Sequence, residues 1–192
     1  MLTIGILSLQ GDYQKHAQML DSLHVETRYV RERADLEQVD ALVIPGGDST
    51  TIGTLMNAYK LLEPIRERIF AGMPVFGTCA GLILLAPQTS EKHQHRLGVL
   101  DITVERNAYG RQVDSFEVDI PVPVVGEVPV RGVFIRAPIV TGTNDGVQVL
   151  AKFENSPVLL QKDNILAASF HPELTEDPRV HSYILQIVSG RK

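Results

Sequence analysis

Apolar residues in the first half of the chain form short, nearly continuous runs that alternate with helix-like stretches. Such runs are typical of parallel strands that are covered on both faces, and they occupy residues 2–9, 25–30, 41–44 and 75–77. The stretches between them predict helices at residues 13–23, 50–59, 63–71 and 81–86. The alternation predicts an α/β fold, an open and mostly parallel sheet with right-handed crossovers and helices on both faces.

Turns rather than helices separate the apolar segments of the second half. Strands are expected at residues 99–105, 116–120, 130–135, 147–153, 157–161 and 165–170. Residues 162–164 predict a hairpin turn, and one last helix is expected over residues 179–188. This half therefore adds antiparallel strands. No repeat or linker divides the sequence, so we expect one domain over residues 1–192.

The composition narrows the range of partners and compartments. With 192 residues the chain can bury a sizeable core, and with a net charge of −5 and no basic run it is not expected to bind nucleic acid. No apolar stretch reaches membrane-spanning length, and no basic leader precedes the N-terminal apolar run. A single cysteine excludes an internal disulfide and fits a reducing compartment. These features predict a soluble, cytoplasmic protein.

The single cysteine lies in the run Gly77-Thr78-Cys79-Ala80-Gly81, between a predicted strand and a predicted helix. Glycines on both sides allow the sharp turn from which a nucleophile projects at the edge of a sheet. The helix that begins at Ala80 directs its free N–H groups and its dipole at the sulfur, which favours the thiolate. Most lone cysteines are buried and act as small hydrophobic residues. Here a histidine motif further along the chain favours the interpretation of Cys79 as a nucleophile.

That motif is His171-Pro172-Glu173, at the end of the predicted strand 165–170. Strand carboxyl ends carry the sites of open α/β sheets. Pro172 disfavours helix at His171, and in extended backbone residues i and i+2 point to the same face. Glu173 is therefore expected beside the imidazole, where a carboxylate fixes the tautomer and stabilises the imidazolium. The alternative is a surface histidine beside a solvated glutamate.

A pair of glycines, Gly46 and Gly47, ends another predicted strand. Glycines let the backbone approach a ligand closely and present N–H groups, so with the Ala80 N–H they are suited to hold an oxyanion. The same turn also fits a plain helix start capped by Asp48 or Ser49. A phosphate cradle is less favoured, because no P-loop lysine follows.

Other polar residues carry weaker signals. Arg106 and Arg136 each follow an apolar strand, and a guanidinium suits a planar carboxylate, although each alone is also compatible with a surface charge. His93 and His95 lie in a charged stretch that is typical of a solvated loop, so we expect no metal site there. His16 is expected to be a helix-face residue.

Together, the cysteine corner and the His-Pro-Glu motif resemble the class I, triad-type glutamine amidotransferases, whose fold is flavodoxin-like. More narrowly, the chain is similar to the glutaminase subunits of pyridoxal 5′-phosphate synthase. The matching motifs follow the family order and occupy residues 9–12, 45–51, 76–86, 104–107, 110–116, 132–138 and 169–175. The triad motif is specific to the superfamily, whereas the blocks around Arg106 and Arg136 are specific to this glutaminase.

The resemblance implies that Cys79 attacks the side-chain amide of L-glutamine, with His171 as base and Glu173 as its orienting carboxylate. It implies that Gly47 and Ala80 supply the oxyanion donors. The positions that match the family's glutamine-binding residues are Gly47, Asp48, Ser49, Arg106, Ile135 and Arg136.

In the family, ammonia passes to a separate (β/α)8 synthase subunit in a large hetero-oligomer, and pyridoxal 5′-phosphate is made on that subunit. The glutaminase subunit is thus expected to hold no cofactor and no metal. Gln10 matches a position near the site and the subunit interface. A flip of the Gly46–Gly47 peptide on partner contact is expected to turn an N–H into the oxyanion hole.

Asp48 departs from the family pattern, which has glutamate in its Gly-Gly-Glu-Ser loop; a backbone role would survive this change. Three other interpretations compete with the resemblance. An amidotransferase subunit of histidine or purine synthesis should lack the Arg106 and Arg136 blocks. A non-catalytic, flavodoxin-like regulatory module should lack a triad member, and none is missing here. A cysteine hydrolase with an unrelated substrate is the third.

Overall fold

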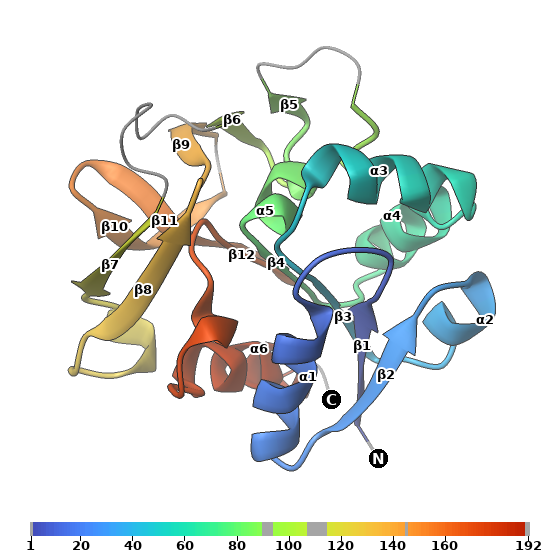
Figure 1. The fold of residues 1–192 in the computed structure, drawn as a ribbon, viewed down its shortest axis with the longest axis horizontal. Helices are drawn as coiled ribbons and strands as arrows, with labels where there is room; N and C mark the ends of the chain where they lie inside the picture. Colours follow the sequence, from blue (N-terminus) through green and yellow to red (C-terminus); the bar gives the residue numbers. More distant parts are fainter. Residues whose placement is uncertain (1, 90–93, 107–114, 145, 191–192) are drawn as a thin grey trace.

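A seven-stranded sheet forms the centre of the molecule (Figure 1). The computed structural model describes residues 2–89, 94–106, 115–144 and 146–190. Within the sheet the strand order is β10-β11-β12-β4-β3-β1-β2. The strands are β1 Thr3–Leu7, β2 Glu26–Val30, β3 Ala41–Ile44, β4 Val75–Thr78, β10 Gln148–Phe153, β11 Ser156–Lys162 and β12 Ile165–Ala168. β2, β1, β3, β4 and β12 run parallel, and β11 and β10 extend the sheet antiparallel.

Helices cover both faces of this sheet, as the alternating pattern predicts. On β3, Leu42 and Ile44 pack into one core with residues of α3, α4 and α5, whereas Ala41 and Val43 join the opposite core with α1 and α6. The helices are α1 Tyr13–Ser22, α2 Arg33–Leu36, α3 Ser49–Ala58, α4 Leu62–Phe70, α5 Ala80–Leu85 and α6 Arg179–Ser189. Among the described residues, no helix has the length and apolar character of a membrane span. The expected α/β fold is confirmed.

The remaining strands form two smaller sheets beside the carboxyl edge of the large one (Figure 1). One sheet joins β5 Gln88–Thr89, β6 Ile102–Glu105 and β9 Ile139–Thr143, and the other pairs β7 Ser115–Ile120 with β8 Val130–Ile135. The antiparallel strands that the second half predicts are therefore present, but only β10, β11 and β12 belong to the central sheet.

Several local expectations need correction. β6 begins at Ile102 rather than at residue 99. β9, α2 and the 3-10 turns Pro123–Val125 and Pro172–Leu174 have no counterpart in the predicted elements. α2 and the 3-10 turns are too short to show a helical period, and the β9 sequence has only two apolar residues, Ile139 and Val140. The predicted hairpin is confirmed, with Lys162 paired to Ile165 across the turn.

The parallel strands place the site. β1, β3, β4 and β12 all point the same way, so the segments that follow them meet at one edge of the sheet. Gln10, Gly46, Cys79 and His171 each come within three residues of the end of one of these strands. Residues far apart in the sequence are thereby brought to one place.

Candidate active site

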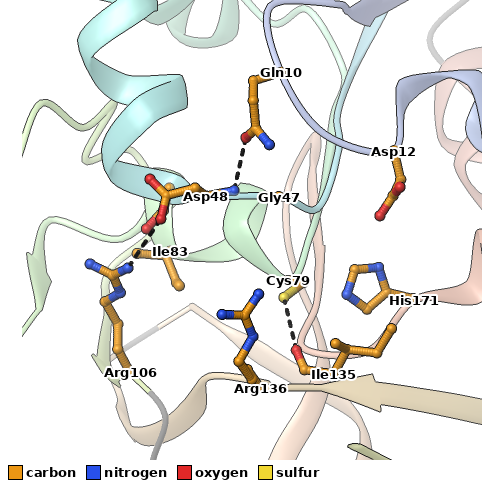
Figure 2. A pocket seen from close by; sticks show the side chains of 11 residues that line it. Gln10, Asp12, Gly47, Asp48, Cys79, Ile83, Arg106, Ile135, Arg136 and His171 are labelled. Carbon is orange, nitrogen blue, oxygen red and sulfur yellow. Dashed lines mark hydrogen bonds and ion pairs between the residues drawn. The ribbon is translucent and has the colours of Figure 1, made fainter. Parts of the chain in front are cut away.

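A cavity of about 260 Å³ opens at this edge (Figure 2). It lies near the lower end of the usual size range of small-molecule pockets, which suits a small polar metabolite. Its lining consists of Gln10, Asp12, Gly47, Asp48, Ser49, Cys79, Ile83, Arg106, Ile135, Arg136 and His171. The six residues that match glutamine-binding positions all belong to this lining. Glu173 lies outside it, behind His171.

Cys79 occupies the sharp corner between β4 and α5. Its backbone has φ 49° and ψ −100°, a conformation that residues with a side chain rarely adopt. The neighbouring glycines are required, because a Cβ on Gly81 would lie 2.2 Å from the Ile44 carbonyl oxygen and one on Gly77 would lie 2.7 Å from Gly81. The backbone at this corner is thus held in one strained conformation, which places the thiol at the cavity.

The sulfur of Cys79 has two polar neighbours, Ile135 and His171 (Figure 2). Its Sγ contacts the Ile135 carbonyl oxygen at 3.9 Å, and its interaction with the His171 side chain is one cause of the raised pKa of that imidazole. Only 7% of the residue is exposed. The α5 helix begins at Ala80, so its first N–H groups lack acceptors within the helix and face the corner.

His171 is buried, and its Nδ1 lies 2.7 Å from Glu173 Oε1. The sequence argument for this contact assumes extended backbone. In the structure Pro172–Leu174 is a 3-10 turn, so the contact forms but that reason for it is wrong. The His171 N–H donates to the Val133 carbonyl at 2.8 Å, which fixes the backbone against β8.

The His171–Glu173 pair is charged. Burial alone would lower the pKa of His171, but hydrogen bonds to Cys79 and Glu173 and the charges of both partners raise it to about 10. Burial would raise the pKa of Glu173, but the contacts of its carboxylate with His16 and His171 hold it far below its ordinary value. The carboxylate therefore remains ionised and stabilises a protonated imidazole.

The glycine turn packs directly against the imidazole. A Cβ on Gly46 would lie 2.3 Å from His171 Cε1, so only glycine fits there. The Gly46 carbonyl accepts a hydrogen bond from the Asp12 N–H at 3.1 Å. Gln10 Oε1 accepts from the Asp48 N–H at 2.8 Å, which ties the loop after β1 to the loop after β3 (Figure 2).

Asp48 caps the N-terminus of α3, as one interpretation of the sequence predicts. Its Oδ1 accepts from the Thr51 N–H at 2.7 Å, and this hydrogen bond is the main reason why the pKa of Asp48 is lowered. Its Oδ2 lies 4.0 Å from Arg106 Nη2, and about half of its side chain is exposed. The carboxylate is thus engaged as a helix cap, with a weak ion pair at the rim.

Charged and polar groups gather at the end of the cavity away from His171. Arg106 and Arg136 reach it from the segments after β6 and β8, and Arg136 has a positive φ of 43° (Figure 2). The buried Ser49 hydroxyl has no hydrogen-bond partner among the described residues. Two guanidinium groups and an unsatisfied hydroxyl are suited to bind the polar end of an amino acid.

Sequence reasoning missed Asp12 as a site residue. Asp12 stands at the N-cap position of α1, but its side chain makes no cap hydrogen bond and instead lines the cavity. Donor atoms of Asp12, His171 and Glu173 lie within 4.8 Å of one another, the spacing of a metal site; however, the His171–Glu173 contact already uses two of them. His95 is exposed, and His93 lies outside the described residues. The sequence feature that could have indicated Asp12 as a site residue is its position shortly after β1.

Known proteins resemble this chain over nearly its whole length. The model of the SNO glutamine amidotransferase family matches residues 6–189. A pyridoxal 5′-phosphate synthase subunit PdxT of Carboxydothermus hydrogenoformans is 52% identical over 187 residues, which cover 97% of this chain and 98% of that protein.

Solved structures agree with the fold. One described as a glutamine amidotransferase superimposes with a TM-score of 0.93 at 48% identity, over 97% of this chain and 98% of the other. The structure of PurLQS from Thermotoga maritima superimposes with a TM-score of 0.69 at 18% identity, over 96% of this chain and 97% of that one. At this low identity, the second structure supports the fold and not the function.

Proposed function

The chain belongs to the SNO glutamine amidotransferase family, and we infer from this membership that it hydrolyses L-glutamine and feeds the ammonia to pyridoxal 5′-phosphate synthesis. The observation that carries the chemistry is one cavity with a thiol at a strained corner, a buried His171–Glu173 ion pair behind it, and two guanidinium groups opposite. An intact triad argues against a non-catalytic module. The paired arginines argue against a hydrolase whose substrate lacks a carboxylate.

We propose the following steps for this site. Cys79 Sγ, whose proton has passed to His171, bonds to the side-chain carbon of glutamine, whose oxygen takes the negative charge. His171 gives the proton to the amide nitrogen, which leaves as ammonia, and a glutamyl thioester remains. A water then loses a proton to His171 and attacks the thioester carbon, which releases glutamate and restores the thiol. Glu173 orients His171 and stabilises its imidazolium throughout.

The proposal assigns substrate binding to the rest of the cavity. Arg106 and Arg136 are suited to the α-carboxylate, and the Ser49 hydroxyl and the backbone of Gly47, Asp48 and Ile135 to the other polar groups. The N–H groups of Ala80 and Gly47 are assigned to the developing oxyanion. No step requires a resident cofactor or metal, since pyridoxal 5′-phosphate is the product of the complex.

We propose further that ammonia is delivered to a separate (β/α)8 synthase subunit in a large hetero-oligomer. Gln10 and Gly46 are the candidate residues for coupling that contact to the site, because Gln10 holds the Asp48 N–H and the Gly46 carbonyl is held by the Asp12 N–H. A flip of the Gly46–Gly47 peptide breaks the second of these hydrogen bonds. Gly47, at φ 152°, tolerates such a change at low steric cost.

Binding of the synthase subunit is expected to raise the turnover number for glutamine about 100-fold or more, because one oxyanion donor contributes roughly two to three orders of magnitude in rate. Glutamate formation from L-glutamine, measured with and without saturating synthase, tests this. The synthase alone should form no glutamate, and L-asparagine should not be hydrolysed. Equal turnover with and without the partner would refute the peptide switch, and no glutamate under either condition would refute the proposed function.

Substitution of Asp48 is expected to change stability more than substrate affinity, because its carboxylate caps α3. Asp48→Ala should lower the free energy of unfolding by about 1 kcal/mol and leave the KM for glutamine within tenfold. Asp48→Glu should change KM by less than about threefold, below roughly 0.7 kcal/mol.

Asp48→Asn separates the cap from the charge, because asparagine caps a helix as well as aspartate does. Its KM and its urea midpoint should both stay near the wild-type values. If the alanine and asparagine variants both raised KM more than tenfold, with synthase saturating, the carboxylate would instead bind the substrate directly.

A further inference from the structure

Two buried histidines have no role in the steps above. His16 of α1 and His181 of α6 are both 0% exposed. His16 contacts Glu173, and neither histidine lines the cavity. The helical pattern predicts only an ordinary helix-face residue at His16. In the structure this ring is completely buried beside a carboxylate. Its polar atoms therefore need hydrogen-bond partners inside the protein.

His16 makes three polar contacts with three other elements. Its Nε2 lies 3.4 Å from Glu173 Oε1 and 3.1 Å from Thr78 Oγ1, and its Nδ1 lies 2.9 Å from His181 Nε2. The Phe76 ring packs in a T-shaped arrangement against both imidazoles and adds apolar contact. One side chain thus joins α1 to α6, to the residue before Cys79 and to the orienting carboxylate.

Hydrogen-bond chemistry assigns the protons in this network. A carboxylate oxygen only accepts, so a bare Nε2 on His16 would face Glu173 Oε1 lone pair to lone pair at 3.4 Å. The proton of this ring is therefore placed on Nε2, which faces both Glu173 Oε1 and, at 3.1 Å, Thr78 Oγ1. Its Nδ1 is then bare and accepts from the Nε2–H of His181. In that tautomer the Nδ1 of His181 is a bare acceptor, and it has no hydrogen-bond partner among the described residues. A proton there would be a buried, unsatisfied donor, and burial also lowers the pKa of His181 to about 3.

The orientation of Glu173 depends on this network. Its Oε1 lies between His171 Nδ1 and His16 Nε2, whereas its Oε2 is buried without a partner among the described residues. With only the His171 contact, the carboxylate could rotate about its Cγ–Cδ bond or follow the imidazole. The second contact, with His16 Nε2, fixes the oxygen that His171 uses.

We propose that His16 is a positioning residue for glutamine hydrolysis, holding Glu173 against His171, and that His181 sets the tautomer in which His16 donates. This inference rests on the proposed function, because His16 acts through the His171–Glu173 pair. His16 and His181 touch neither the substrate cavity nor the thiol, so their effect is on turnover rather than on binding.

Two substitutions at position 16 separate donation from packing. Glutamine can place its amide nitrogen near the position of imidazole Nε2, whereas asparagine reaches only the position of Nδ1. Glutamine therefore keeps the donor to Glu173, and asparagine loses it. In the full chain with saturating synthase, His16→Asn should lower kcat roughly 10- to 100-fold, the effect typical of losing a contact that orients a group in the site, with KM changed less than threefold. His16→Gln should keep kcat within fivefold of wild type, and His24→Asn, at an exposed histidine, should be unchanged.

Equal losses of kcat in the glutamine and asparagine variants, or equal rates in both, would overturn the proposal. Urea unfolding of both variants shows whether they are folded.

The tautomers give a readout that does not depend on activity. With ¹⁵N-labelled histidine, signals assigned from the His16 and His181 variants should show a proton on Nε2 and a bare Nδ1 in both rings. A proton on Nδ1 of either ring would contradict the network, even if the enzyme hydrolyses glutamine. If wild type does not hydrolyse glutamine but the tautomers are as assigned, the proposed function fails and the network stands.

Discussion

Cys79→Ala is expected to reduce glutamine hydrolysis more than about a thousandfold, because the thioester cannot form without the sulfur. Binding should survive, since Arg106 and Arg136 are untouched. The fold should survive as well. Alanine keeps the Cβ that already exists at this positive φ, and removal of one sulfur leaves a small cavity, which costs about 1 kcal/mol or less.

Turnover with saturating synthase and the urea midpoint of the same preparation check both parts of this expectation. Cys79→Ser is the matched control, because it restores an atom of similar size and hydrogen-bonding capacity. Its hydroxyl is a far weaker acid than a thiol, so it should remain inactive while it folds like wild type. Wild-type turnover in the alanine variant would remove Cys79 from the mechanism.

His171→Asn is expected to lower kcat by roughly two to four orders of magnitude, the usual contribution of a general acid–base group. Asparagine can still donate to Glu173 from near the position of Nδ1, so the buried carboxylate keeps a partner. It cannot take the thiol proton or return one to the leaving ammonia. The KM for glutamine should change little, because His171 meets the amide end of the substrate rather than the arginines.

Glu173→Gln should cost less than His171→Asn, because it disturbs the tautomer and orientation of a base that is still present. Steady-state kinetics of both variants with saturating synthase establish the order of the two effects. If His171→Asn kept the wild-type rate, His171 would not be the base. If Glu173→Gln were the more damaging change, the carboxylate would do more than orient the imidazole.

The sequence predicts the central sheet and the placement of the triad because both depend on local patterns. A buried strand, a glycine on each side of Cys79 and the start of a helix already define the corner. His171 and the Gly46–Gly47 turn follow other parallel strands, and parallel topology brings their ends together. An open parallel sheet brings the ends of these strands together, so the fold class is enough to predict that these residues meet.

What could not be predicted depends on contacts between distant elements. His16 and His181 are 165 positions apart and meet only because α1 and α6 cover the same face of the sheet. The helical pattern shows that His16 faces the sheet side, but not that a carboxylate lies opposite. The contact between His171 and Glu173 is predicted by the motif, but it is made by a 3-10 turn rather than by extended backbone.

The central claim, that Cys79 forms a covalent bond with glutamine in this cavity, can be tested most directly by trapping that bond. A diazoketone analogue of L-glutamine, incubated with the chain and saturating synthase, should add one equivalent to Cys79, as read by intact and peptide mass spectrometry. Adduct formation should parallel the loss of turnover, be slowed by L-glutamine, and be absent in Cys79→Ala. Loss of turnover with the adduct on another residue, or full turnover with Cys79 labelled, would contradict the account.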